Sequence, residues 1–233
     1  MRMPAIPLAV LLGFNGGFVD TAGFLGLQGL FTSHVTGNFV TLGASLVLGT
    51  SGVLTKMLAI PVFIVAVGLT RLAGNRLADH KRASMPALFS AQAVLLGVFF
   101  LLAVTFGPFA DGDAPMAMLA GLIGVCAMAI QNAVQRMHLS SEPPTTILTG
   151  TTTQFAIDLM DLITKRPSMA SHDARRHFMA FFRAIVCFGA GSMLAAASFY
   201  FVGLACLIVA VAIASFVAVL KARDVSGETG MLM

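Results

Sequence analysis

Two polar stretches, each built around a Thr-Gly pair, interrupt an otherwise apolar chain of 233 residues. The first reads Phe-Thr-Ser-His-Val-Thr-Gly-Asn-Phe-Val over residues 31–40, and the second reads Thr-Thr-Ile-Leu-Thr-Gly-Thr-Thr-Thr-Gln over residues 145–154. Their glycines, Gly37 and Gly150, lie 113 positions apart, so each half of the chain carries one stretch. β-Branched residues favour an extended chain and glycine permits a turn. Each stretch therefore predicts a short extended segment that turns into a short helix.

The start of such a short helix can bind a small polar or anionic solute. The first N–H groups of a helix lack intrahelical partners and carry partial positive charge. Six residues are expected to cap the two helices or to bind the solute: Thr36, Gly37, Asn38, Thr149, Gly150 and Thr151. The alternative is that the Thr hydroxyls bond only to their own helix backbone and take no part in binding.

Three further polar residues lie at corresponding places in the two halves. Asp20 lies in the middle of the first apolar segment, where a carboxylate is costly and is usually functional. It predicts a proton or cation site, or a partner for a polar substrate group; the alternative is a structural hydrogen bond to the broken segment. Gln131 and Asn132 occupy the matching place in the second half. They either bind substrate or join neighbouring helices through hydrogen bonds.

Three titratable residues close to these stretches are assigned structural roles. We expect His34 to have a structural role and to support the first stretch. Asp158 and Asp161 share one helical face and could serve a coupling ion. We favour ion pairs between them and the following residues, Lys165 and Arg166, at the membrane interface.

The elements that position these residues must lie in a membrane. Hydrophobic residues make up 58% of the chain and charged residues 10%, against roughly 45–50% and 25% in soluble domains. The basic residues cluster at the ends of apolar segments, as topology signals do, so the net charge of +4 does not indicate a nucleic-acid partner. The three cysteines lie in apolar runs without metal-ligand spacing, so neither a metal nor a cofactor is expected.

The expected fold is an all-α polytopic membrane protein made of two inverted repeats. Each repeat has three spanning helices and one broken helix that follows a short extended segment. The first repeat covers residues 1–110, with spans near 6–30, 54–72 and 85–106 and a broken segment near 31–50. The second covers residues 111–223, with spans near 116–134, 178–201 and 204–220 and a broken segment near 145–163; residues 224–233 are expected to form a disordered tail.

The distribution of positive charge favours this arrangement over eight full crossings. With six spans and the N-terminus inside, eleven basic residues fall on the cytoplasmic side and only Lys56 falls outside. Eight spans give at best eight inside and four outside. The eleven are Arg2, Arg76, Lys81, Arg82, Arg136, Lys165, Arg166, Arg175, Arg176, Lys221 and Arg223. Both termini are therefore expected in the cytoplasm.

Several of these blocks resemble the YoaK-like bacterial membrane proteins, a family named as a domain of unknown function. They are residues 17–20 (Gly-Phe-Val-Asp), 31–38, 131–133 (Gln-Asn-Ala), 145–150 and 158–159 (Asp-Leu), and together they extend over nearly the whole chain. The resemblance implies a multi-pass protein of the bacterial inner membrane. It supplies no substrate.

These observations favour a secondary transporter or facilitator of a small polar or anionic solute, bound between the two helix starts at the membrane midplane. A channel of the same architecture and a structural or assembly protein without transport are the alternatives. No enzyme activity is expected, because the chain contains neither Gly-x-Ser-x-Gly nor His-Glu-x-x-His. The expected partners are the solute or ion and membrane lipid. So small a bundle is also compatible with a homodimer, although no segment marks an interface.

Overall fold

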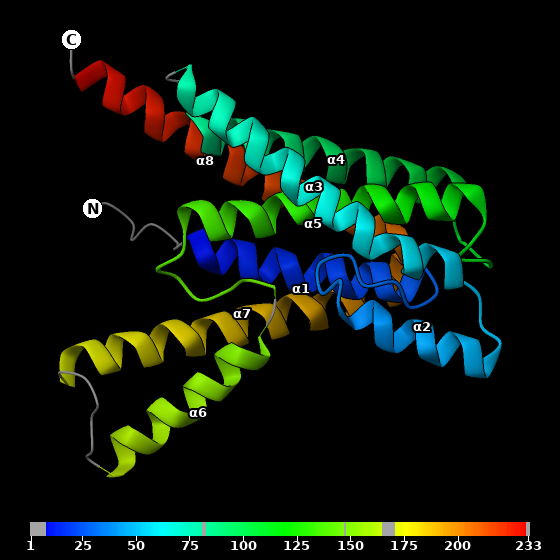
Figure 1. The fold of residues 1–233 in the computed structure, drawn as a ribbon, viewed down its shortest axis with the longest axis horizontal. Helices are drawn as coiled ribbons and strands as arrows, with labels where there is room; N and C mark the ends of the chain where they lie inside the picture. Colours follow the sequence, from blue (N-terminus) through cyan, green and yellow to red (C-terminus); the bar gives the residue numbers. More distant parts are fainter. Residues whose placement is uncertain (1–7, 81–82, 147, 165–170, 232–233) are drawn as a thin grey trace.

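The fold is a bundle of helices. The computed structural model describes residues 8–80, 83–146, 148–164 and 171–231, and all regular structure in these ranges is helical. The helices are α1 (Leu8–Gly26), α2 (Gly37–Leu48), α3 (Val53–Asp79), α4 (Ser84–Phe106), α5 (Pro115–His138), α6 (Thr149–Thr164), α7 (Ser171–Val202) and α8 (Ile208–Met231), with a 3₁₀ turn η1 (Gly203–Leu207) between the last two (Figure 1). The expected all-α class is confirmed.

Five stretches within the described residues are long and apolar enough to cross a membrane. Four of them correspond to α1, α3, α4 and α5, and the fifth is a 48-residue stretch, Phe178–Val225. That stretch would measure about 72 Å as one straight helix, more than twice the ~30 Å hydrocarbon core. Instead the chain reverses at η1, where Gly203 has a φ of 57° that suits glycine, and α8 runs back alongside the bundle. The chain therefore folds as a multi-pass membrane protein.

The two short helices follow loops that turn back into the bundle (Figure 1). After α1, residues 27–36 return to the middle of the molecule, and α2 then runs in the same direction as α1. After α5, residues 139–146 do the same from the opposite end, and α6 continues in the direction of α5. The helices α2 and α6 contain only 12 and 16 residues. At about 1.5 Å per residue, both are shorter than the hydrocarbon core.

The C-terminal end of the chain differs from the expected disordered tail. Helix α8 continues to Met231, so residues 224–231 are helical. An ion pair between Lys221 Nζ and Asp224 Oδ2, 2.8 Å apart, joins positions three residues apart on this helix. Such a pair stabilises the turn that contains it. The helix also packs along α4, which holds it against the bundle.

Helix α1 lies at the centre of the bundle and meets α7 at a very close crossing. A Cβ atom on Gly191 of α7 would lie 2.1 Å from the backbone oxygen of Phe14, and one on Gly17 of α1 would lie 2.2 Å from the backbone oxygen of Phe188. Only glycine fits at either place. On the other side of α1, a Cβ on Gly16 would lie 2.8 Å from the oxygen of Thr145. The adjacent glycines therefore let α1 approach both α7 and the second broken segment.

The loop between α4 and α5 caps the start of α3. Asp113 Oδ1 accepts hydrogen bonds from the Thr55 N–H (2.9 Å) and the Thr55 hydroxyl (3.0 Å). Burial raises the pKa of Asp113, but hydrogen bonds from Thr55, Leu54 and Gly52 outweigh that effect, so its pKa lies below the usual value. A carboxylate here also faces the positive end of the α3 dipole. The carboxylate of Asp113 thus holds this loop at the start of α3.

The Asp113 cap predicts a pH-dependent contribution to stability. Because the folded-state pKa is depressed, the contribution is complete above about pH 4, the usual unfolded value, and is lost as the pH falls through the folded value. Asp113→Asn keeps the Oδ1 acceptor but removes the charge that faces the start of α3, so it should lower the melting temperature at pH 7 by about 1–4 °C. The difference should shrink towards pH 3 in melts followed by circular dichroism. Asp79→Asn, an exposed carboxyl at the other end of α3, is the matched control. If the melting temperature of Asp113→Asn stays below that of the wild type by the same amount from pH 7 to pH 3, the prediction is contradicted.

Candidate functional site

The first broken segment is held by the carboxylate of Asp20. Its Oδ1 accepts hydrogen bonds from three consecutive backbone N–H groups, those of Thr32 (2.8 Å), Ser33 (2.8 Å) and His34 (3.4 Å). The side chain is only 4% exposed. Three successive amides reach one oxygen only if the chain curls around it, so residues 32–36 form bends and turns where we expected an extended segment. Asp20 thus makes the structural hydrogen bonds that we had considered as the alternative to a solute site.

The start of α2 is closed by its own loop. The N–H groups of Gly37, Asn38 and Phe39 donate to carbonyls three residues earlier, at 2.9, 3.0 and 3.2 Å. Asn38 also pairs with the backbone of Phe31, accepting from its N–H at 2.9 Å and donating to its oxygen at 2.8 Å. Thr36 occupies the N-cap position but makes no capping side-chain hydrogen bond. Few amides at this helix start remain free for a solute.

The second broken segment is held by side chains of α5 in the same way. Thr146 donates its hydroxyl to Asn132 Oδ1 at 2.5 Å, and Gln131 donates to the Thr145 hydroxyl at 3.3 Å. Gln131 also accepts from Gln92 of α4 at 2.9 Å. It is fully buried and lies within a network of amides rather than in a cavity. We did not identify Gln92 as a candidate from the sequence, although a single amide side chain within the apolar segment 85–106 could have indicated it.

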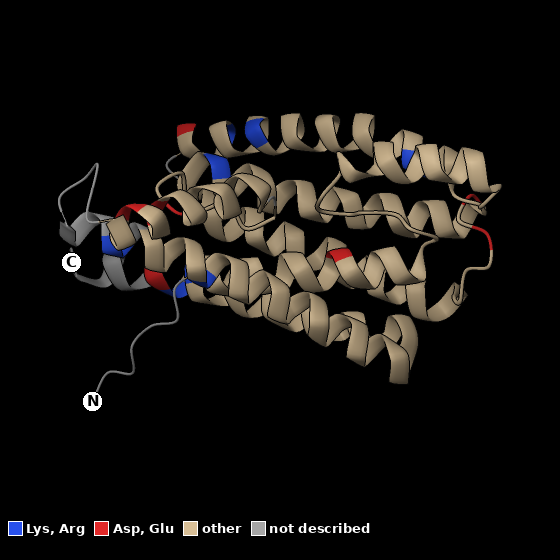
Figure 2. Cartoon of the chain, turned by 90° about the horizontal axis from the view of Figure 1, so that it is seen from below, with Lys and Arg blue, Asp and Glu red and all other residues tan. Residues whose placement is uncertain are grey.

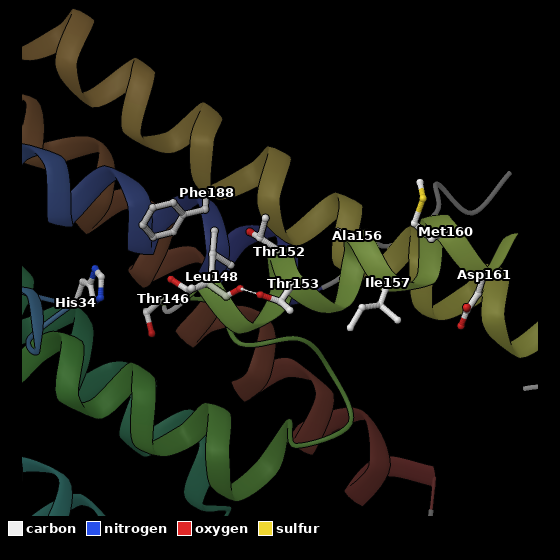
Figure 3. A pocket seen from close by; sticks show the side chains of 11 residues that line it. His34, Thr146, Leu148, Thr152, Thr153, Ala156, Ile157, Met160, Asp161 and Phe188 are labelled. Atoms are coloured by element: carbon white, nitrogen blue, oxygen red, sulfur yellow. Dashed lines mark hydrogen bonds between the residues drawn. The ribbon is translucent and has the colours of Figure 1, made fainter. Parts of the chain in front are cut away.

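The start of α6 borders a cleft of about 920 Å³. Figure 3 shows His34, from the first broken segment, at one end of this cleft, and Met160 and Asp161 of α6 at the other, with Phe188 of α7 alongside. The remaining lining residues are Thr146, Leu148, Thr149, Thr152, Thr153, Ala156 and Ile157. The cleft therefore combines Thr hydroxyls and a helix start with apolar walls.

His34 and Phe188 also border a second cavity, of about 310 Å³. This cavity reaches Asp20 and Thr21 on α1 and the ring of Phe31. The two hollows thus share two lining residues, and together they extend from the start of α6 to the loop held by Asp20. His34, to which we assigned only a supporting role, lies where they meet.

The predicted site residues are distributed over several places. Thr149 lines the large cleft, Asp20 lines the second cavity, and Asn132 lines a third cavity between α3 and α5. Thr151 is buried, and its hydroxyl has no hydrogen-bond partner among the described residues. The others border none of these hollows: Thr36, Gly37, Asn38, Gln131 and Gly150.

The two acidic residues of α6 have different surroundings. Asp158 accepts a hydrogen bond from Gln154 at 2.7 Å, whereas Asp161 borders the large cleft. Lys165 and Arg166, their expected partners, lie outside the described residues. Within the described ranges, no three His, Cys, Asp or Glu side chains gather as metal ligands would.

Apolar spanning helices, polar loops that turn back into the bundle and a cleft lined by Thr and apolar side chains define a multi-pass helical membrane protein. The model of the family described as "Protein of unknown function (DUF1275)" matches residues 8–220, so the chain belongs to this family. YoaK-like proteins are members of it, which confirms the resemblance read from the sequence. No curated protein and no solved structure matches the chain.

Proposed function

We propose that the protein is a secondary transporter or facilitator of a small polar or anionic solute, which binds in the cleft at the start of α6. The observation that carries this proposal is the cleft of about 920 Å³, which is bordered both by His34 of one broken segment and by the Thr-rich start of the helix that follows the other. Non-helical backbone at membrane depth is tolerated where it is buried in protein or lines a wet cavity. The partial positive charge at a helix start favours a polar or anionic ligand there.

The two halves act as inverted repeats in this proposal. In each half a polar side chain of the first span holds the following broken segment: Asp20 holds Thr32 and Ser33, and Asn132 holds Thr146. The packing supports the same relation. Helix α1 packs on α7 and α5 packs on α3, so the first span of each half contacts the third helix of the other half. In transporters with this symmetry, solutes bind between the broken helices, and one half moves against the other.

The distribution of charge supports an orientation with both termini in the cytoplasm of a bacterial cell. Figure 2 shows that most Lys and Arg residues lie at the end of the molecule where α1 begins and α8 ends. The acidic loop with Asp111 and Asp113 joins α4 to α5 at the opposite end. Positive residues are enriched on the cytoplasmic side of membrane proteins. We also propose that the protein moves its solute without catalysing a reaction.

Two hydroxyls of the cleft provide a direct test. Purified protein would first be screened by thermal melting against small anions and polar metabolites, since a ligand that binds only the folded form raises the melting temperature. Thr149→Val and Thr153→Val keep the shape of the cleft but remove a hydroxyl. Each variant should weaken binding of a stabilising solute about three- to tenfold, as expected for one lost hydrogen bond. Uptake of the same solute into liposomes should fall in parallel.

Thr164→Val is the matched control. Thr164 lies on the same helix and donates its hydroxyl to Met160 O at 2.8 Å, much as Thr153 donates to Thr149 O at 3.0 Å, but it does not border the cleft. Its binding and uptake should equal those of the wild type. Unchanged binding in both cleft variants, for a solute that the protein demonstrably transports, would remove the cleft from the mechanism.

A further inference from the structure

A third cavity, of about 330 Å³, lies between α3 and α5 and shares one lining residue, Thr146, with the cleft at α6. It is bordered by two arginines, Arg71 of α3 and Arg136 of α5. The other lining residues are Phe63, Val67, Asn132, Ala133, Gln135, Met137, Pro144 and Thr146. Such a combination of two cations and an apolar wall is not needed for packing two helices together.

The lining of the cavity changes from apolar to cationic along α3. Phe63, Val67 and Arg71 are spaced four residues apart and form one stripe along α3. Helices α3 and α5 run in the same direction, towards the end of the molecule where the basic residues gather (Figures 1 and 2). Arg136 lies in the last turn of α5. Arg71 precedes the end of α3 by about 12 Å, at ~1.5 Å per residue, and a long arginine side chain can extend to the interface.

Both guanidinium groups are available to a ligand. Among the side chains that the structure describes, no carboxylate pairs with either arginine, and neither guanidinium donates a hydrogen bond. Both residues are exposed. A guanidinium group near lipid without a counter-ion is costly, whereas a phosphate can accept two of its N–H groups at once.

A buried polar atom provides a second, independent observation. Gln135 is 5% exposed and borders the same cavity. Its Nε2 donates to backbone oxygens of the loop after α5, the shortest contact being 3.0 Å to Leu139 O. Its Oε1 is buried and has no hydrogen-bond partner among the described residues. An unpaired buried acceptor requires a donor, such as a hydroxyl group of a ligand.

We propose that this cavity binds one anionic phospholipid. The headgroup phosphate lies between Arg71 and Arg136, a headgroup or glycerol hydroxyl approaches Gln135 Oε1, and an acyl chain follows the stripe of Phe63 and Val67 towards the bilayer centre. The order of cationic, polar and apolar groups matches the order of groups in such a lipid. Basic pockets between helices on the cytoplasmic side are known places for anionic headgroups.

The test compares phosphatidylglycerol with phosphatidylcholine and with inorganic phosphate. In phosphatidylcholine nanodiscs, added phosphatidylglycerol should raise the melting temperature of the wild type, and native mass spectrometry should show one retained molecule. The double variant Arg71→Gln, Arg136→Gln should bind that molecule at least about tenfold more weakly, the effect of losing charge-assisted contacts. Arg71→Lys, Arg136→Lys should recover only part of the binding, because lysine lacks the planar fork.

Arg76→Gln, Arg223→Gln is the matched control, since both arginines are exposed and lie outside the cavity. It should keep the retained lipid and the full thermal shift. Equal losses in the two Gln variants would overturn the proposal in favour of unspecific surface charge. A shift reproduced by inorganic phosphate at millimolar concentration would overturn the lipid assignment in favour of a free anion. If the double Gln variant does not fold, the double Lys variant serves as the test. Unchanged retention of the lipid by the double Lys variant would also overturn the proposal.

Discussion

Asp20→Ala is expected to lower the melting temperature by about 10 °C. The substitution removes the oxygen that accepts the N–H groups of Thr32, Ser33 and His34. Each buried donor left without a partner costs about 1–3 kcal/mol, and about 1 kcal/mol corresponds to 2–4 °C in a chain of this size. The melt should be followed by circular dichroism, because the chain has no Trp and a single Tyr for intrinsic fluorescence.

Asp20→Asn separates the two roles considered for this residue. Asparagine keeps an oxygen acceptor but loses the charge, so if Asp20 only holds the loop, the loss should be about 1–2 kcal/mol and uptake should persist. A variant that melts like the wild type but no longer transports would instead assign the charge to the transport step. An Asp20→Ala variant as stable as the wild type would contradict the structural role.

Gly191→Ala is expected to destabilise the protein by about 1–3 kcal/mol, the usual cost of forcing an extra carbon into a packed core. The new Cβ would lie 2.1 Å from Phe14 O and 3.1 Å from Phe14 Cα. These are backbone atoms that cannot rotate away, so α1 itself must move. Gly17→Ala should have a similar effect for the reciprocal reason, since its new Cβ would lie 2.2 Å from Phe188 O.

Gly189→Ala, two residues earlier on α7, is the matched control. Nothing lies within 4 Å of a Cβ at this position. Since alanine is the better helix former by about 1 kcal/mol, this variant should be at least as stable as the wild type. Equal melting temperatures for Gly189→Ala and Gly191→Ala would show that α1 and α7 do not cross at the distance described.

The class of the protein and the places where its helices break could be predicted from the sequence. The observed helices begin and end within a few residues of most predicted spans, and α2 and α6 begin at the two Thr-Gly pairs. These properties are local. An apolar composition indicates that the chain lies in lipid, and a glycine after a run of Thr residues indicates a turn. Neither inference depends on how the rest of the chain packs.

The roles of individual polar residues could not be read in this way. The sequence placed Asp20 and Thr36 together as solute ligands, but in the structure Asp20 holds the loop and Thr36 makes no capping bond. Which hydrogen bond a carboxylate makes depends on where the chain returns after twelve residues. The sequence pattern contains no information on that path.

The apolar composition and the two Thr-Gly stretches by themselves determined that the chain forms a helical bundle in lipid and that this bundle contains two broken segments. Only the tertiary structure decided that His34 and the start of α6 border one cleft, that Gly17 and Gly191 face each other's helices, and that Arg71 and Arg136 border one cavity. Each of these meetings depends on how two helices are rotated and shifted against one another. Residues more than sixty positions apart acquire that relation only when the bundle packs.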